Sequence, residues 1–193
     1  MTDEELMRAL QAGDRAALAP LVRRYHRPLM AYYYRLSGDY HLSQDLAQEC
    51  FFRLVMRARH YRYPEPLRPW LYRMATNIWR DHVKSAPYRH GRAALPLETA
   101  GTTAAPEPPL EEVVIRKVLA QDALAALRRL PAPYAEVLAL RFGQDLTVPE
   151  IAAVLDLPEG TIKSRIFYGL RRLRALMDKE VPHHDQQAGV TRG

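Results

Sequence analysis

The chain has 193 residues, of which 28 are Lys or Arg and 22 are Asp or Glu, so its formal charge is +6 at pH 7. Apolar residues make up 48% and charged residues 26%, which is typical of a folded globular protein and excludes a disordered or fibrous chain. Cys50 is the only cysteine, which excludes an internal disulfide framework and a zinc site built from several thiolates. No apolar run reaches the roughly 18 residues of a membrane span, and the acidic start Met1–Glu5 is unlike a signal peptide. We expect a cytoplasmic protein without membrane insertion, whose charge favours a polyanionic partner.

Charge and proline are unevenly distributed, which predicts two basic domains separated by a linker. The net charge is +5 over residues 1–84, −2 over 85–112 and +3 over 113–193, and the middle segment holds 5 of the 15 prolines. Within it, Pro106–Pro109 is incompatible with a helix, because proline removes a donor and restricts the preceding residue. The predicted division is a first domain at 1–84, a flexible linker at 85–112, a second domain at 113–178 and a disordered tail at 179–193.

The first domain is predicted to be entirely helical, because its apolar residues repeat at helical spacing and no segment alternates with a period of two. Thr2 and Glu5 have the spacing of a capping box for a first helix. The further helices expected here run from Asp14 to about Leu36 with an end near Gly38, from an N-cap at Ser43 through Ala58, and from Pro69-Trp70 to about Lys84.

The second domain is predicted to contain a helix-turn-helix. Thr147 and Glu150 form another capping box, and Asp156 stands in a short turn that requires a residue tolerant of the left-handed conformation. The helices expected in this domain are Val113–Leu130, Tyr134–Phe142 ended by Gly143, Pro149–Leu155 and Glu159–Met177. A capped short helix, a tight turn and a longer basic helix together indicate binding to duplex DNA.

The last predicted helix carries the strongest signal for DNA. From Thr161 to Arg174 it holds five basic residues and no acidic one. A helix fits the major groove, and its N-terminal residues reach the base edges while later cations contact phosphates. The candidate duplex-binding residues are Thr161, Lys163, Ser164, Arg165, Tyr168, Arg171 and Arg172. The alternative is a solvated basic helix in an ordinary bundle.

The fourth predicted helix of the first domain carries a second signal. Arg73, Asn77, Arg80 and Lys84 are spaced by four, three and four, so they share a face opposite the apolar stripe. Trp70 and Trp79 flank this face. Cations with aromatic rings suit single-stranded nucleic acid, and an asparagine can read an unpaired base. The alternative is a solvated face with the tryptophans in the core.

The third predicted helix has an acidic and polar edge at Asp45, Gln48 and Glu49, beside Phe51 and Phe52. Such an edge in a basic protein suggests a protein contact, although the spacing by itself favours a merely solvated face. Catalytic and metal-binding patterns are absent from the sequence, which has no glycine-rich phosphate loop, no HExxH motif and no histidines at metal-ligand spacing. Cys50 is expected to be a packed thiol. We therefore predict neither enzyme activity nor a cofactor.

In order and spacing, the motifs from Glu5 to Met177 resemble those of the extracytoplasmic-function sigma factors, bacterial relatives of sigma-70. The segments that carry the resemblance are Tyr25–Leu29, Asp45–Phe51 (D-x-x-Q-E-x-F), Arg68–Asn77, Leu130–Arg141, Glu150–Ala152 and Gly160–Arg165. The resemblance implies two small helical domains, a four-helix sigma-2-like bundle and a sigma-4-like helix-turn-helix domain, joined by the linker.

The resemblance also implies roles for the candidate residues. The edge formed by Asp45, Gln48, Glu49 and Phe51 would dock on the β′ clamp coiled coil of core RNA polymerase, and the second domain would contact the β flap. Residues Thr161–Arg172 would read the −35 element as duplex. An anti-sigma factor is a further expected partner. The residues expected to hold the melted −10 strand are Tyr63, Trp70, Arg73, Asn77 and Arg80.

A rival interpretation is a helix-turn-helix repressor or activator that binds duplex DNA as a dimer, without core polymerase. It would need a dimerisation helix and palindromic half-sites. The first domain instead offers the basic and aromatic face suited to a single strand. A metal-dependent nuclease is less favoured, because no carboxylates converge in the pattern.

Overall fold

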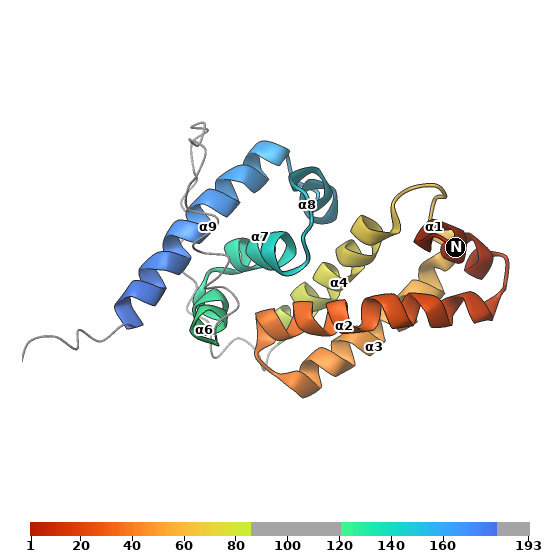
Figure 1. The fold of residues 1–193 in the computed structure, drawn as a ribbon, viewed down its shortest axis with the longest axis horizontal. Coiled ribbons are helices and arrows are strands. Elements are labelled where there is room, and N and C mark those ends of the chain that lie inside the picture. Colours follow the sequence, from red (N-terminus) through yellow and green to blue (C-terminus); the bar gives the residue numbers. More distant parts are fainter. Residues whose placement is uncertain (86–120, 181–193) are drawn as a thin grey trace, which may run out of the picture.

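The computed structural model describes residues 1–85 and 121–180, and every regular element within these ranges is helical. Figure 1 shows two groups of helices that lie against each other. The first group comprises α1 (Asp3–Gln11), α2 (Leu18–Ser37), α3 (Tyr40–Arg57) and α4 (Leu67–Lys84). The second comprises α6 (Gln121–Arg129), α7 (Ala132–Gly143), α8 (Val148–Leu155) and α9 (Glu159–Glu180). The prediction of an all-α protein with two small helical domains is confirmed.

Part of the predicted division cannot be followed in the structure. Apart from Ser85, the linker at 85–112 lies outside the described residues, and so does the expected helix start at Val113. Of the tail predicted at 179–193, Lys179 and Glu180 are the last residues of α9, and the rest lies outside the described residues. Among the helices that are described, none combines the length and apolarity that crossing a membrane requires.

The N-terminal helix α1 is capped locally and in turn caps α4. The predicted capping box is confirmed: Thr2 Oγ1 accepts from the Glu5 amide at 3.2 Å, and Glu5 Oε2 accepts from the Thr2 amide at 2.7 Å. The neighbouring Glu4 accepts a hydrogen bond from the Leu67 amide at 3.1 Å. Helix α4 therefore begins two residues before the predicted Pro69, because its cap comes from a residue distant in sequence.

The predicted N-cap of α3 is wrong. The cap is Asp39, whose carboxylate accepts from the Leu42 amide at 3.1 Å. Ser43 lies buried one turn inside the helix, where its hydroxyl donates to the Asp39 carbonyl at 2.5 Å. Gly38 ends α2 in the left-handed conformation, at φ 75°, so α3 can start almost at once.

The core of the first domain lies between α2, α3 and α4, which pack on one another. Leucines from all three helices are fully buried there, among them Leu29, Leu54 and Leu71. Two buried tyrosines from α2 bond to α4: Tyr32 pairs with the Thr76 hydroxyl at 3.0 Å, and Tyr33 donates to the Ala75 carbonyl at 3.2 Å. Burial raises the pKa of both phenols, so they remain neutral donors. This core fixes the rotation of α4 about its own axis.

The helix-turn-helix forms as predicted. The Thr147 amide donates to Glu150 Oε2 at 2.7 Å, and Asp156 adopts the left-handed conformation at φ 55°. Ile151 of α8 and Ile162 of α9 are fully buried, so the two helices share one apolar core. Local sequence signals therefore suffice for this motif.

Gly169 allows α9 to pack closely on α7. A Cβ atom at this position would lie 3.3 Å from Leu138 Cδ1 and 3.4 Å from Tyr134 Cβ. At Gly160, in the first turn of the same helix, a Cβ atom would meet nothing within 4 Å. The same substitution at the two glycines therefore separates overpacking from helix propensity.

We predict that Gly169→Val lowers the free energy of unfolding by about 1–3 kcal/mol, because the added methyl groups overpack the contact between α7 and α9. Gly160→Val should change it by less than about 0.5 kcal/mol. Urea denaturation followed by circular dichroism measures both. Equal losses for the two variants would show that the close approach at Gly169 has no energetic importance.

Candidate nucleic-acid interface

Helix α4 presents its polar face away from the core. As predicted, Leu71, Met74, Ala75 and Ile78 are buried, whereas Arg73 and Asn77 are exposed and Arg80 is half-buried. Trp79 is only 1% exposed, which supports the alternative that it belongs to the core rather than to a stacking surface. The packing of the apolar face of α4 in the core thus keeps its polar face directed away from the core.

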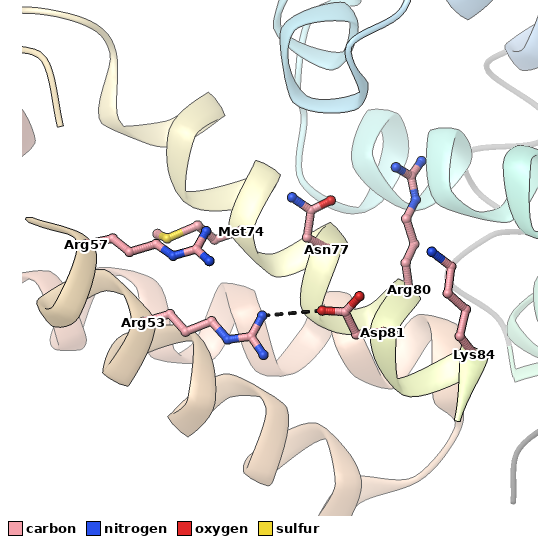
Figure 2. A pocket seen from close by; sticks show the side chains of 7 residues that line it. All are labelled: Arg53, Arg57, Met74, Asn77, Arg80, Asp81 and Lys84. Atoms are coloured by element: carbon pink, nitrogen blue, oxygen red, sulfur yellow. Dashed lines mark ion pairs between the residues drawn. The ribbon is translucent and has the colours of Figure 1, made fainter. Parts of the chain in front are cut away.

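A pocket of about 330 Å³ lies between α3 and α4 at this face. Figure 2 shows the residues that line it, which are Arg53, Arg57, Met74, Asn77, Arg80, Asp81 and Lys84. Four of them are cations and one is a carboxylate, so the pocket suits an anionic ligand such as a nucleic-acid backbone. The Asn77 amide supplies a donor and an acceptor beside it.

Two arginines of the pocket were missed by the sequence reasoning. Arg53 and Arg57 lie on α3, four residues apart, and their spacing could have indicated a basic edge. Arg53 is held by ion pairs to Glu49 at 2.7 Å and to Asp81 at 3.6 Å, the second drawn in Figure 2. Helical periodicity could not predict that α3 faces α4 across this pocket.

The aromatic residues expected to help bind the −10 strand lie near the start of α4 and do not line the pocket. Trp70 is half-buried and packs edge-to-face on Tyr61, with ring centroids 5.5 Å apart. Tyr63 is exposed, and the Arg8 guanidinium lies 4.7 Å from its ring centroid. Gln11 fixes this loop by donating to the Ala58 and Tyr61 carbonyls at 2.9 and 2.7 Å. The structure therefore brings Asn77 and Arg80 together and leaves Tyr63 and Trp70 apart from them.

Two arginines of the α4 face contact the second domain. Arg73 donates to the Ala153 carbonyl at the C-terminal half of α8, from Nε at 3.1 Å and from Nη2 at 2.5 Å. Arg80 binds the buried carboxylate of Glu136 on α7, with its Nη2 2.7 Å from Oε2. Hydrogen bonding to Glu136 raises the pKa of Arg80. Sequence reasoning could not find these contacts, because they join residues 56 or more positions apart.

The candidate duplex-binding residues of α9 differ in how exposed they are to solvent. Lys163 and Arg171 are exposed, whereas Thr161, Ser164, Arg165, Tyr168 and Arg172 are half-buried. Arg172 lies over the Tyr134 ring, 5.0 Å from its centroid. Burial lowers the pKa of Arg165, and Glu136 and Arg80 act on it electrostatically in opposite directions. Part of this helix thus faces the boundary between the domains.

The outward face of α3 differs from the predicted one in a single residue. Asp45 and Gln48 are exposed and Glu49 is half-buried, but Phe51 is only 9% exposed and stacks on His26. Its neighbour Phe52 is 62% exposed. Phe51 follows Ala47 by four residues and so lies on the buried stripe. Helical spacing from Asp45 and Glu49 instead leads to Phe52 and Met56, both of which are exposed.

No cluster of three or more potential metal ligands occurs among residues 1–85 and 121–180. Cys50 is buried in the first domain, and burial raises the pKa of its thiol to about 12. The prediction of a packed thiol is confirmed.

Comparison with known proteins gives matches over both domains. Residues 21–87 match the family model described as Sigma-70 region 2, and residues 126–175 match that described as Sigma-70, region 4. The chain is 30% identical over 185 residues to the ECF RNA polymerase sigma factor SigW of Bacillus subtilis, covering 90% of this chain and 96% of that protein. It is 34% identical over 182 residues to the ECF RNA polymerase sigma factor SigE of Mycolicibacterium smegmatis, covering 91% and 68%.

Solved structures share the fold. CnrH, solved in complex with the cytosolic domain of CnrY, superposes with a TM-score of 0.69 at 24% identity, over 92% of this chain and 98% of that chain. The sigma factor RpoE of Bartonella quintana, in complex with the anti-sigma factor NepR, superposes with a TM-score of 0.63 at 19% identity, over 84% and 97%.

Proposed function

The chain belongs to the extracytoplasmic-function sigma factors, which direct RNA polymerase to promoters, and we propose that its two domains bind two physical forms of one promoter. The first domain holds the melted −10 strand, and the second reads the −35 element as duplex. The observation that carries this division is the basic pocket beside Asn77 in one domain, combined with a basic helix-turn-helix in the other. The action takes place in the cytoplasm, on the polymerase.

Melting under this proposal requires no hydrolysis by the chain. A surface that binds unpaired bases better than duplex shifts the equilibrium towards the open form by its differential affinity. The cations around the pocket neutralise the displaced strand, and Asn77 offers hydrogen bonds to an extruded base. The chain thus acts by binding, and polymerase supplies the chemistry.

Core polymerase is the proposed partner of the α3 face. Asp45, Gln48 and Glu49 supply polar contacts for the β′ clamp coiled coil. Phe52 replaces Phe51 as the apolar anchor because, of these two phenylalanines, it is the exposed one. The second domain is proposed to contact the β flap. An anti-sigma factor is a further proposed partner, supported by the similar fold of RpoE, which was solved in complex with the anti-sigma factor NepR.

Transcription in vitro tests the function as a whole. Purified chain and core polymerase, with fragments of genomic DNA as template, should give transcripts with defined starts, and core polymerase by itself should not. Gel shift separates the rival regulator: that protein binds duplex tightly without polymerase, whereas tight promoter binding here should require core enzyme. Tight and specific duplex binding by the isolated chain would contradict the proposal.

Adjacent phenylalanines on α3 provide a matched test of polymerase docking. We predict that Phe52→Ala weakens binding to core polymerase roughly tenfold while leaving stability almost unchanged, because an exposed anchor is removed. Phe51→Ala should instead lower the free energy of unfolding by about 3 kcal/mol, because it leaves a cavity in the core. Fluorescence titration with core enzyme and urea denaturation measure the two effects. Normal core binding by a folded Phe52→Ala protein would contradict this docking surface.

Asn77→Ala and Arg165→Ala test the division of labour between the domains. The first should reduce permanganate reactivity of the promoter bubble while core binding stays normal, because it removes a contact to an unpaired base. The second should weaken binding of holoenzyme to −35 duplex but not to a single-stranded −10 probe. Each variant serves as the control of the other. A variant that loses binding equally to the −35 duplex and to the single-stranded −10 probe would refute the separation of roles.

A further inference from the structure

The second domain covers part of the proposed −10 surface in the free chain. Arg80 is bound through Nε and Nη2 to both carboxylate oxygens of Glu136, at 2.7 to 3.2 Å. Arg73 is bound to the Ala153 carbonyl. In Figure 2 the Arg80 side chain extends from α4 towards the ribbon of α7, which carries Glu136. Two of the cations proposed to bind the strand are therefore already occupied.

Glu136 is an unusual residue for its position. It is 3% exposed, on a helix whose neighbouring positions, from Tyr134 to Leu140, are all buried. A carboxylate buried in this way is costly unless it is paired and hydrogen-bonded. Its pairing partner is Arg80 of the other domain, and Arg165 lies within its electrostatic influence. Glu136 thus lies between the two arginines that are proposed to contact the two parts of the promoter.

The contact between the domains is geometrically specific. Each domain places an arginine against a glycine of the other: a Cβ atom at Gly38 would lie 2.9 Å from Arg128 Nε, and one at Gly143 would lie 2.9 Å from Arg35 Nε. Tyr72 donates to Gln144 Oε1 at 2.5 Å from within the boundary. The domains therefore meet in one defined arrangement.

The same contact carries costs that favour separation. Arg35 Nη1 is buried without a hydrogen-bond partner, which is unfavourable in the closed arrangement. When the domains part, both Glu136 and Arg80 regain water, which offsets much of the lost attraction. Buried apolar residues of the two domains also belong to one continuous cluster, so the contact is only partly polar. Interfaces between domains of one chain otherwise resemble transient protein–protein contacts. A ligand that binds the open form can therefore shift this equilibrium.

Resting on the proposed function, we propose that Glu136 is an internal competitor of the promoter backbone for Arg80, and that it holds the free chain in a closed, autoinhibited arrangement. A carboxylate offers the guanidinium two oxygens in the same fork geometry as a phosphate. Closure and strand binding at Arg80 exclude each other, so the apparent affinity for a single strand is the affinity of the open form reduced by the open fraction.

Glu136→Gln in the full chain tests this proposal, with Asp122→Asn as the control. Asp122 is an exposed carboxylate on α6 of the same domain, so its substitution removes the same charge without touching Arg80. The first measurement is the radius of gyration by small-angle X-ray scattering. The second is fluorescence anisotropy with a labelled single-stranded oligonucleotide of mixed sequence. Glu136→Ala, checked for folding by circular dichroism, is a second variant that removes both oxygens.

Both Glu136 variants should expand the chain in scattering and tighten single-strand binding roughly tenfold, as expected when a mostly closed population opens. Asp122→Asn should leave the radius unchanged and improve binding by less than twofold. The proposal is overturned if the radius stays at the wild-type value, or if it grows without tighter binding. Transcription with core polymerase is measured separately. Promoter-directed transcription without the predicted change in radius would contradict closure but not the proposed function. The predicted changes in radius and strand binding without such transcription would contradict the proposed function but not closure.

Discussion

The packing of α4 against α2 and α3 is the constraint on which the other features of the first domain depend. One side of α4 is committed to the core through Leu71, Ile78 and the hydrogen bond between Thr76 and Tyr32. Since side chains three and four residues apart share a face, this commitment determines where Asn77 and Arg80 point. The basic pocket is thus a consequence of core packing rather than a separate feature, and a change in the core would displace it.

The sequence predicted the features that depend on neighbours within one turn or one helical face. The capping boxes at Thr2 and Thr147, the left-handed Asp156 and the apolar stripe of α4 all depend on spacings of a few residues, which are visible in the chain. Two of its errors were also local. Ser43 lost the N-cap to Asp39, which follows a left-handed glycine, and Phe51 was placed outside although the buried stripe of α3 passes through it.

What the sequence could not predict depends on contacts between distant residues. Glu4 caps α4 across 63 positions, and Arg80 meets Glu136 across 56. Helical periodicity identifies the apolar and polar faces of each helix, but it does not show which face of another helix packs against them. For this reason Arg53 and Arg57 were missed at the pocket, and a buried glutamate in an apolar helix gave no sign of its partner.

The two proposed contact surfaces of the first domain differ in how accessible they are when the domains are packed together. On α3, Phe52 and Met56 remain exposed, so the proposed polymerase surface is free to bind. On α4, Arg73 and Arg80 are bound by the second domain. Under the proposed roles, a chain with this asymmetry takes up polymerase before it engages a single strand. If core polymerase binds the open form better than the closed form, its binding supplies the free energy needed to break the contact between Glu136 and Arg80. A ligand shifts an equilibrium only by its differential affinity for the two states. Promoter melting is then confined to the assembled holoenzyme.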